Sequence, residues 1–136
     1  MYERKIPLTV DCGLHLTREI LNGKWKPALL KAVALNLKRP GEMFRLLPGA
    51  TRRVLNVQLK ELEQHGMIEK KIYPELPPKV EYSLTDLGWS IMPIIDAMDA
   101  WGDANRKLLE AVIGRDREII KTAQSLKELL PSRRSS

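Results

Sequence analysis

Residues 47–85 read LPGATRRVLNVQLKELEQHGMIEKKIYPELPPKVEYSLT, and the change of pattern within them is the main indication of the fold. A helical pattern begins at Thr51, a good N-cap residue, and stops at Gly66. The pattern then changes to the alternation typical of strands, over residues 67–73 and 79–84, with PELPP between the two runs. The stretch therefore predicts a helix followed directly by a two-stranded hairpin with a stiff, exposed tip.

Apolar residues at helical spacing predict three shorter helices before that stretch, over residues 14–21, 24–37 and 42–47. Gly23 suits the left-handed cap that ends the first helix. Pro27 falls in the first turn of the second helix, where its missing N–H costs nothing. Arg39-Pro40-Gly41 breaks the pattern before the third helix. Short helices followed by a hairpin indicate a winged helix-turn-helix.

The helical period returns after the hairpin. Thr85 is expected to cap a long helix whose apolar positions continue to Val112, and Pro93 is expected to kink or unwind it. Gly114 interrupts the pattern, and residues 115–130 form a last helical segment. The predicted fold is mainly α with a small β-hairpin, a winged helix-turn-helix with a long C-terminal dimerisation helix.

The 136 residues have the length of one domain, and we expect residues 1–136 to form a single winged-helix domain. Its parts are an N-terminal arm (1–13), the helix-turn-helix and wing (14–84), the C-terminal helices (85–130) and a tail (131–136). The net charge of +6 and the pI of about 9.6 favour polyanionic partners, nucleic acid first and an anionic membrane surface second. No apolar run is long enough for a signal peptide or a membrane span, which predicts a cytoplasmic protein.

The helix that begins at Thr51 has a leucine face and a cationic face. Leu55, Leu59 and Leu62 fall in one narrow sector of a helical wheel and are expected in the core. The other side suits a DNA major groove, because arginine can bond guanine, asparagine can bond adenine and a valine methyl can contact thymine. The expected DNA-binding residues of this helix are Thr51, Arg52, Arg53, Asn56, Val57 and Lys60. A solvated face without a ligand is the alternative.

The hairpin adds positive charge next to this helix. Lys70, Lys71 and Lys79 are expected to contact DNA phosphates. Loss of Lys70 or Lys71 should therefore weaken binding to all DNA sequences alike. Residues 38–79 contain nine basic and five acidic side chains. This clustering favours DNA binding over a merely solvated surface.

Several motifs in residues 12–102 resemble the HxlR-type transcriptional regulators, a MarR-related branch of the winged-helix proteins. In order along the chain they are Cys12, NGKW (22–25), LPGATRRVL (47–55), LKELE (59–63), GMI (66–68), PPKVEYSLT (77–85), LG (87–88) and WG (101–102). The resemblance implies a homodimeric DNA-binding repressor or activator, in a bacterium or archaeon, that reads double-stranded DNA at a palindromic operator. It also implies that residues 51–65 are the recognition helix in the major groove and that the wing, residues 68–84, lies on the minor groove or the backbone.

Two features depart from the pattern of that family. The family usually has an aromatic residue where this chain has Pro40 after Arg39, so the third helix is expected to start later or to pack differently. The family often follows its N-terminal cysteine with proline, whereas Gly13 follows Cys12 here. The backbone around this thiol is therefore expected to be looser.

Cys12 is a candidate regulatory residue, because some members of the family sense oxidants or electrophiles through this cysteine. As the single cysteine of the chain, it can form only an intersubunit or a mixed disulfide. The equal alternative is a small, packed apolar residue at the dimer interface. With two histidines and one cysteine, a single chain cannot assemble a tetrahedral zinc site, and we expect no metal or cofactor.

Apolar residues of the long helix recur at heptad-like spacing and exceed what a three-helix core needs. The expected dimer interface consists of Leu14, Met98, Trp101, Asn105, Leu108 and Val112. Asn105 would set the register between the paired helices. Alternatively, the segment 115–130 folds back and covers this surface within one subunit.

Other classes of function fit the sequence less well. The chain has no arranged carboxylate pair and no glycine-rich phosphate loop after a strand, so we expect no catalytic residues and no enzyme. A winged-helix adaptor that binds proteins and not DNA is the main alternative. An RNA reader is disfavoured, because Tyr73 and Tyr82, the aromatic residues of the hairpin, both belong to a strand pattern.

Overall fold

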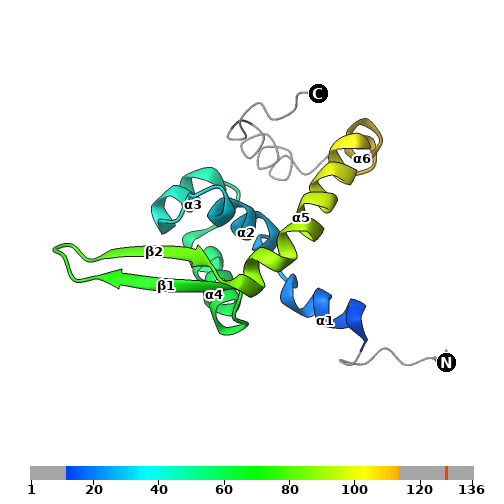
Figure 1. Cartoon of the computed structure of the whole chain (residues 1–136). Helices are drawn as coiled ribbons and strands as arrows, with labels where there is room; N and C mark the ends of the chain where they lie inside the picture. The colour runs from blue at the N-terminus through cyan, green and yellow to red at the C-terminus, as the bar shows by residue number, and fades with distance from the viewer. Residues whose placement is uncertain (1–11, 114–127, 129–136) are drawn as a thin grey trace, which may run out of the picture.

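A computed structural model describes residues 12–113 and Glu128. The hairpin projects from one side of the helical body, and α6 lies at the opposite side (Figure 1). The elements are α1 (Gly13–Ile20), α2 (Lys26–Ala34), α3 (Pro40–Leu46), α4 (Arg52–Gln64), β1 (Ile68–Tyr73), β2 (Lys79–Leu84), α5 (Asp86–Ala104) and α6 (Arg106–Ile113). This order confirms the mainly α winged helix-turn-helix that the sequence predicts.

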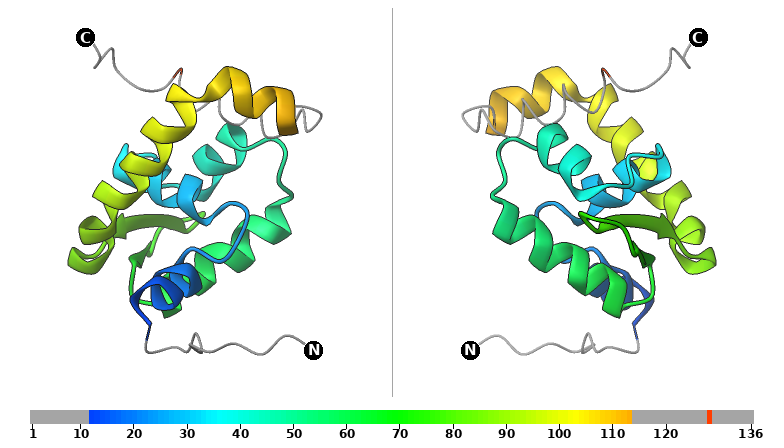
Figure 2. Two further views of the ribbon diagram at one scale, coloured as in Figure 1. Left: turned by 90° about the vertical axis from the view of Figure 1, so that its right-hand side faces the viewer. Right: turned by 90° about the vertical axis from the view of Figure 1, so that its left-hand side faces the viewer.

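Helix α2 lies between α4 and α5 and forms the centre of the core (Figure 2). Leu29 and Leu30 of α2 are completely buried, as are the three leucines of α4 that the helical wheel assigned to the core, Leu55, Leu59 and Leu62. The base of the hairpin joins this core through Ile68, Tyr82 and Leu84. Burial of one continuous apolar surface fixes α4 and the hairpin against the same central helix.

The predicted helix boundaries around the hairpin are confirmed. The Thr51 hydroxyl accepts a hydrogen bond from the Val54 N–H at 3.1 Å, and the Thr85 hydroxyl accepts one from the Gly88 N–H at 3.0 Å. Gly66 has a φ of 78°, a conformation that favours glycine, and it ends α4. These local signals place α4 and the hairpin at the expected residues.

The start of α5 is packed directly on the turn between α4 and β1. The Thr85 hydroxyl also donates to the Gly66 carbonyl at 2.6 Å, and a Cβ atom on Gly88 would overlap the Met67 carbonyl oxygen. Gly88 is therefore required by close backbone approach. The LG motif of the sequence thus marks the contact between α5 and the hairpin.

Three predictions about the first helices are wrong. Gly23 does not have the positive φ of a left-handed cap, and α1 ends at Ile20 with Leu21 as its C-cap. Helix α3 begins earlier than predicted, because Pro40 is accepted in the first turn and the Glu42 carboxylate accepts the Arg39 N–H at 3.1 Å. Helix α2 ends at Ala34, shortly before Asn36 turns the chain with a φ of 70°.

The single long helix predicted after Thr85 is also wrong, since α5 and α6 are separate. Helix α5 ends at Ala104, where the Trp101 carbonyl accepts both the Asn105 N–H at 3.2 Å and the Asn105 side-chain amide at 2.9 Å. Pro93 does not unwind the helix, because α5 continues through it from Asp86 to Ala104. The predicted segment 115–130 lies outside the described residues, except for Glu128.

Candidate nucleic-acid interface

The outward face of α4 is open to solvent, as the sequence predicts. The exposed side chains are Thr51, Arg52, Arg53, Asn56, Val57 and Lys60, and even the apolar Val57 is 49% exposed. Among the described residues, Arg53 and Lys60 form no ion pair at 4.0 Å or less. The face therefore presents cationic and amide groups that are available to a ligand.

Arg52 is set apart from Arg53 by its surroundings. Its guanidinium lies 5.2 Å from the centre of the Phe44 ring of α3, a cation–π contact. This contact joins one flank of α4 to the preceding helix. The two adjacent arginines thus differ, since Arg52 braces the helix-turn-helix and Arg53 points outward without such a contact in the described structure.

The lysines of the hairpin lie on both of its faces. Strand pairing places Lys70 opposite Tyr82 and Lys71 opposite Glu81, and successive side chains of a strand point to opposite faces. Lys71 and Lys79 both lie over the Tyr73 ring, at 5.0 and 4.9 Å from its centre. The sequence pattern treated the three lysines alike, whereas the structure separates Lys70 from the other two.

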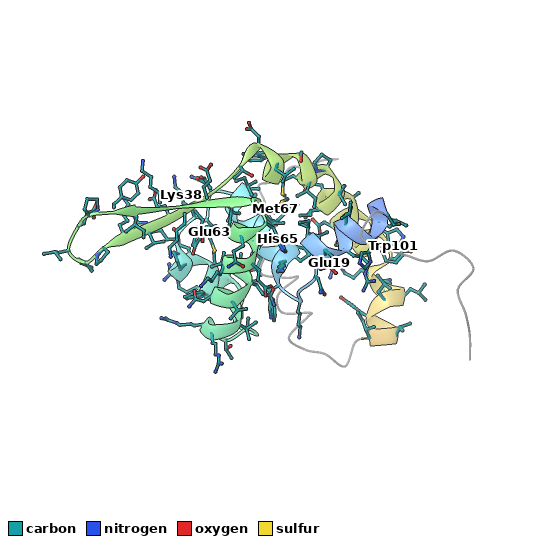
Figure 3. All side chains as sticks on the ribbon, turned by 90° about the horizontal axis from the view of Figure 1, so that it is seen from below. Glu19, Lys38, Glu63, His65, Met67 and Trp101 are labelled. Carbon is teal, nitrogen blue, oxygen red and sulfur yellow. The ribbon has the colours of Figure 1, made fainter. Side chains whose placement is uncertain are left out.

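Glu81 of β2 is a shared partner for three cations. Its carboxylate lies 3.7 Å from the Lys79 ammonium, 3.8 Å from Arg39 and 3.9 Å from Lys38. The backbone N–H of Tyr82 donates to the Lys38 carbonyl at 2.8 Å, which ties the hairpin to the segment between α2 and α3. Figure 3 shows Lys38 beside the hairpin. Lys79 therefore has an internal partner that would compete with a phosphate.

Two buried lysines of α2 were not predicted as site residues. Lys26 is only 2% exposed, and its ammonium lies 2.8 Å from the Glu61 carboxylate on α4. Lys31 is 8% exposed and reaches Asp96 at 2.9 Å and Asp99 at 3.4 Å on α5. Their partners are 35 and 65 or more residues away in sequence, and no local pattern connects such distant residues.

The flank of α4 that faces α2 is polar. The Gln58 side-chain oxygen accepts the Trp25 N–H at 2.9 Å, and Glu61 one turn later bonds Lys26. The hydrogen bond that Lys26 donates to the Glu61 carboxylate, together with the positive charge of Lys26, lowers the pKa of the Glu61 carboxyl below its usual value. Neither Gln58 nor Glu61 was singled out from the sequence, because their partners precede α4 by a whole helix.

The predicted dimer residues other than Asn105 are exposed apolar side chains in the described part of the chain. We refer to Leu14, Met98, Trp101, Leu108 and Val112 together as the apolar face. Leu14, Leu108 and Val112 are 79, 68 and 73% exposed. Trp101 lies at the other end of the molecule from the hairpin tip (Figure 3). Asn105 differs from the rest, because its amide is bonded to the Trp101 carbonyl.

Cys12 is half-buried immediately before α1, where its carbonyl accepts the Leu16 N–H at 2.9 Å. The His15 imidazole, three residues further on, lies 3.9 Å from the Glu19 carboxylate. Within residues 12–113 and Glu128, no group of three or more His, Cys, Asp or Glu side chains is placed to hold a metal ion. None of the helices in this part of the chain has both the length and the apolar character of a membrane span.

Comparison with known proteins agrees with the fold. The model of the HxlR-like helix-turn-helix family matches residues 20–110. The chain belongs to this family. It is 38% identical over 126 residues to YybR, an HTH-type transcriptional regulator of Bacillus subtilis (strain 168), and the match covers 91% of this chain and 99% of that protein.

Solved structures of related regulators have the same architecture. The redox regulator HypR in its reduced form is 40% identical, with a TM-score of 0.68, over 74% of this chain and 99% of that chain. The reduced form of YodB from B. subtilis is 31% identical, with a TM-score of 0.55, over 68% of this chain and 91% of that chain. These relatives are regulators and not enzymes, and the HxlR-like chain described here is a transcriptional regulator with a helix-turn-helix fold.

Proposed function

We propose that this HxlR-like protein is a homodimer that binds double-stranded DNA sequence-specifically, with α4 in the major groove. The outward face of α4 carries this proposal, since Arg53 and Lys60 are exposed and unpaired in the described structure and Asn56 lies between them. An arginine bonds guanine through two parallel hydrogen bonds, and an asparagine bonds adenine in the same way. The first turn of α4 adds backbone N–H groups and a positive dipole end, which favour a phosphate.

The hairpin is proposed to act as the wing, on the minor groove or the backbone. Lys70 and Lys71 point to opposite faces of the hairpin, so a hairpin inserted between two phosphate strands would offer one cation to each strand. Contacts to phosphate position a protein on DNA without reading its sequence. The wing is therefore assigned to affinity, and α4 to sequence preference.

The apolar face is proposed to pair two subunits. Exposed leucine, valine and tryptophan side chains cost free energy in water, and burial against a second copy of the chain would remove that cost. Two recognition helices in such a dimer would read half-sites about 34 Å apart on a palindromic operator. Sedimentation velocity would show dimers for the wild type and for Leu76→Glu, at the hairpin tip, and monomers for Leu108→Glu.

A DNA-binding measurement tests the central proposal. A duplex selected by the wild-type protein from a random library would be titrated at low ionic strength and compared with a scrambled duplex. Arg53→Ala is expected to cost about 1–3 kcal/mol on the selected duplex and to relax its sequence preference. A wild-type protein that does not bind double-stranded DNA would favour the adaptor function, in which this surface contacts another protein.

We further propose that Cys12 makes DNA binding sensitive to thiol oxidants. HypR, which shares 40% identity with this chain, is a redox regulator solved in reduced and oxidised forms, and YodB was solved after diamide treatment. Cys12 is half-buried and lies two residues before Leu14 of the apolar face, so a dimer formed through this face is the setting for an intersubunit disulfide. DNA binding with and without diamide should differ for the wild type and not for Cys12→Ser. An equal response of both proteins would exclude this role.

A further inference from the structure

We propose that Gln58 and Glu61 are positioning residues for the reading of DNA by α4. Both are bonded to residues 23–26, the segment that leads into α2, and these bonds set the rotation of α4 about its own axis. This inference rests on the proposed function. It gives a role to the flank of α4 that faces α2, whose side chains are not expected to contact DNA. Two directional bonds to one short segment, together with a close approach of its backbone, are the observations that support it.

The first bond joins the backbone of this segment to the side chain of Gln58. The Trp25 N–H donates to the Gln58 side-chain oxygen at 2.9 Å across 33 residues of sequence. A Cβ atom on Gly23 would lie 2.9 Å from the same amide group, closer than such atoms pack in proteins. Gly23 is therefore needed for the close approach of Gln58. This contact, and not a positive φ angle, explains the glycine of the NGKW motif.

The second bond buries a charge. The Lys26 side chain is 2% exposed, and its ammonium lies 2.8 Å from the Glu61 carboxylate, which remains 45% exposed. A buried ammonium is costly unless it has a hydrogen-bonded partner of opposite charge. Because Glu61 satisfies this requirement, any rotation of α4 that moves Glu61 away leaves Lys26 uncompensated. The pair thus opposes rotation of α4 in addition to the apolar packing.

Rotation of α4 matters because base contacts tolerate little displacement. Side-chain groups on a helix lie about 5–6 Å from its axis, so a rotation of about 10° moves them by about 1 Å. Hydrogen bonds from N–H groups to oxygen occupy a window of roughly 0.5 Å in length. The leucine face of α4 is held by non-directional contacts, whereas the bonds of Gln58 and Glu61 have a direction. These bonds are therefore suited to fixing the angle at which Arg53 and Asn56 meet the bases.

The test compares Glu61→Gln with Glu63→Gln, which lies two residues away on the same helix, is exposed, and makes the same change in net charge. For each protein, the dissociation constants for the duplex selected by the wild type and for a scrambled duplex would be measured at a temperature where all variants are folded. The ratio of the two constants is expected to fall about tenfold in Glu61→Gln, the equivalent of one weakened base contact, and to stay unchanged in Glu63→Gln.

Gly23→Ala provides an independent route to the same effect, because its methyl group would push the Gln58 amide away from Trp25. Gly41→Ala is the matched control, since its nearest neighbouring atom, on Arg45, would be 3.8 Å away. Gly23→Ala should lower the ratio as Glu61→Gln does, whereas Gly41→Ala should not.

The outcomes separate the inference from the proposed function. If Glu61→Gln and Gly23→Ala lower the melting temperature but keep the wild-type ratio, the bonds are only structural and the inference is overturned. If the wild-type protein selects no sequence at all, the proposed function itself fails, and the inference falls with it. A lower ratio in both variants, with both controls unchanged, supports the positioning role.

Discussion

Lys70→Ala offers the sharpest test of how the hairpin would meet DNA. Lys70 is exposed and, among the described residues, has no ion pair, so a phosphate bound by it would release a counterion without displacing an internal partner. Each phosphate contact on duplex DNA contributes about 0.9 to the slope of log K against log salt, so the two copies in a dimer contribute about 1.8. When the salt concentration is raised from 50 to 200 mM, the affinity of the wild type for DNA therefore falls by a factor roughly tenfold larger than the affinity of Lys70→Ala does.

Fluorescence anisotropy with a labelled duplex, titrated at several salt concentrations, would measure these slopes. Lys107→Ala is the control, because it removes the same charge from α6, at the opposite side of the molecule from the hairpin (Figure 1). Lys79→Ala should reduce the slope less than Lys70→Ala, because Glu81 lies 3.7 Å from the Lys79 ammonium and competes with phosphate. Equal slopes for Lys70→Ala and Lys107→Ala would refute the wing's contact with the DNA backbone.

Three further predictions concern the fold that carries this surface, and urea unfolding measures each of them. Gly88→Ala should lower the free energy of unfolding by about 3 kcal/mol or more through backbone overlap, whereas Gly102→Ala in the same helix, with no atom within 4 Å of the added Cβ, should leave it unchanged or raise it by up to about 1 kcal/mol. Leu59→Ala empties a completely buried position and should cost about 2–5 kcal/mol, and a smaller loss would mean that the core collapses around the cavity. Because the folded-state pKa of Glu61 is lowered, its pair with Lys26 stabilises the fold above pH 4.5, and that contribution is lost as the pH falls through the folded-state pKa. The free energy of unfolding of Glu61→Gln should thus be lower than that of the wild type at pH 7 and approach it in acid.

Helix α4 shows how far local patterns reach. Thr51 as N-cap, Gly66 as terminator and the leucine face are properties of a few consecutive residues, and the structure has all three where they were predicted. The hairpin strands were predicted to within one residue, because alternation and the PELPP tip are local as well. The same local reasoning failed at Asn105, where α5 ends and α6 begins although the apolar pattern continues through this residue.

The fold class, the outward face of α4 and the cationic hairpin could be predicted, because helical period, capping and strand alternation are encoded within one or two turns. Which charges are internal depends instead on tertiary packing. Lys26 and Lys31 look like ordinary surface lysines until the packing of α2 buries them and brings Glu61, Asp96 and Asp99 into reach. Such pairs depend on the relative placement of helices that are distant in the chain, and that placement is set by the burial of apolar surface over the whole domain and not by any local signal.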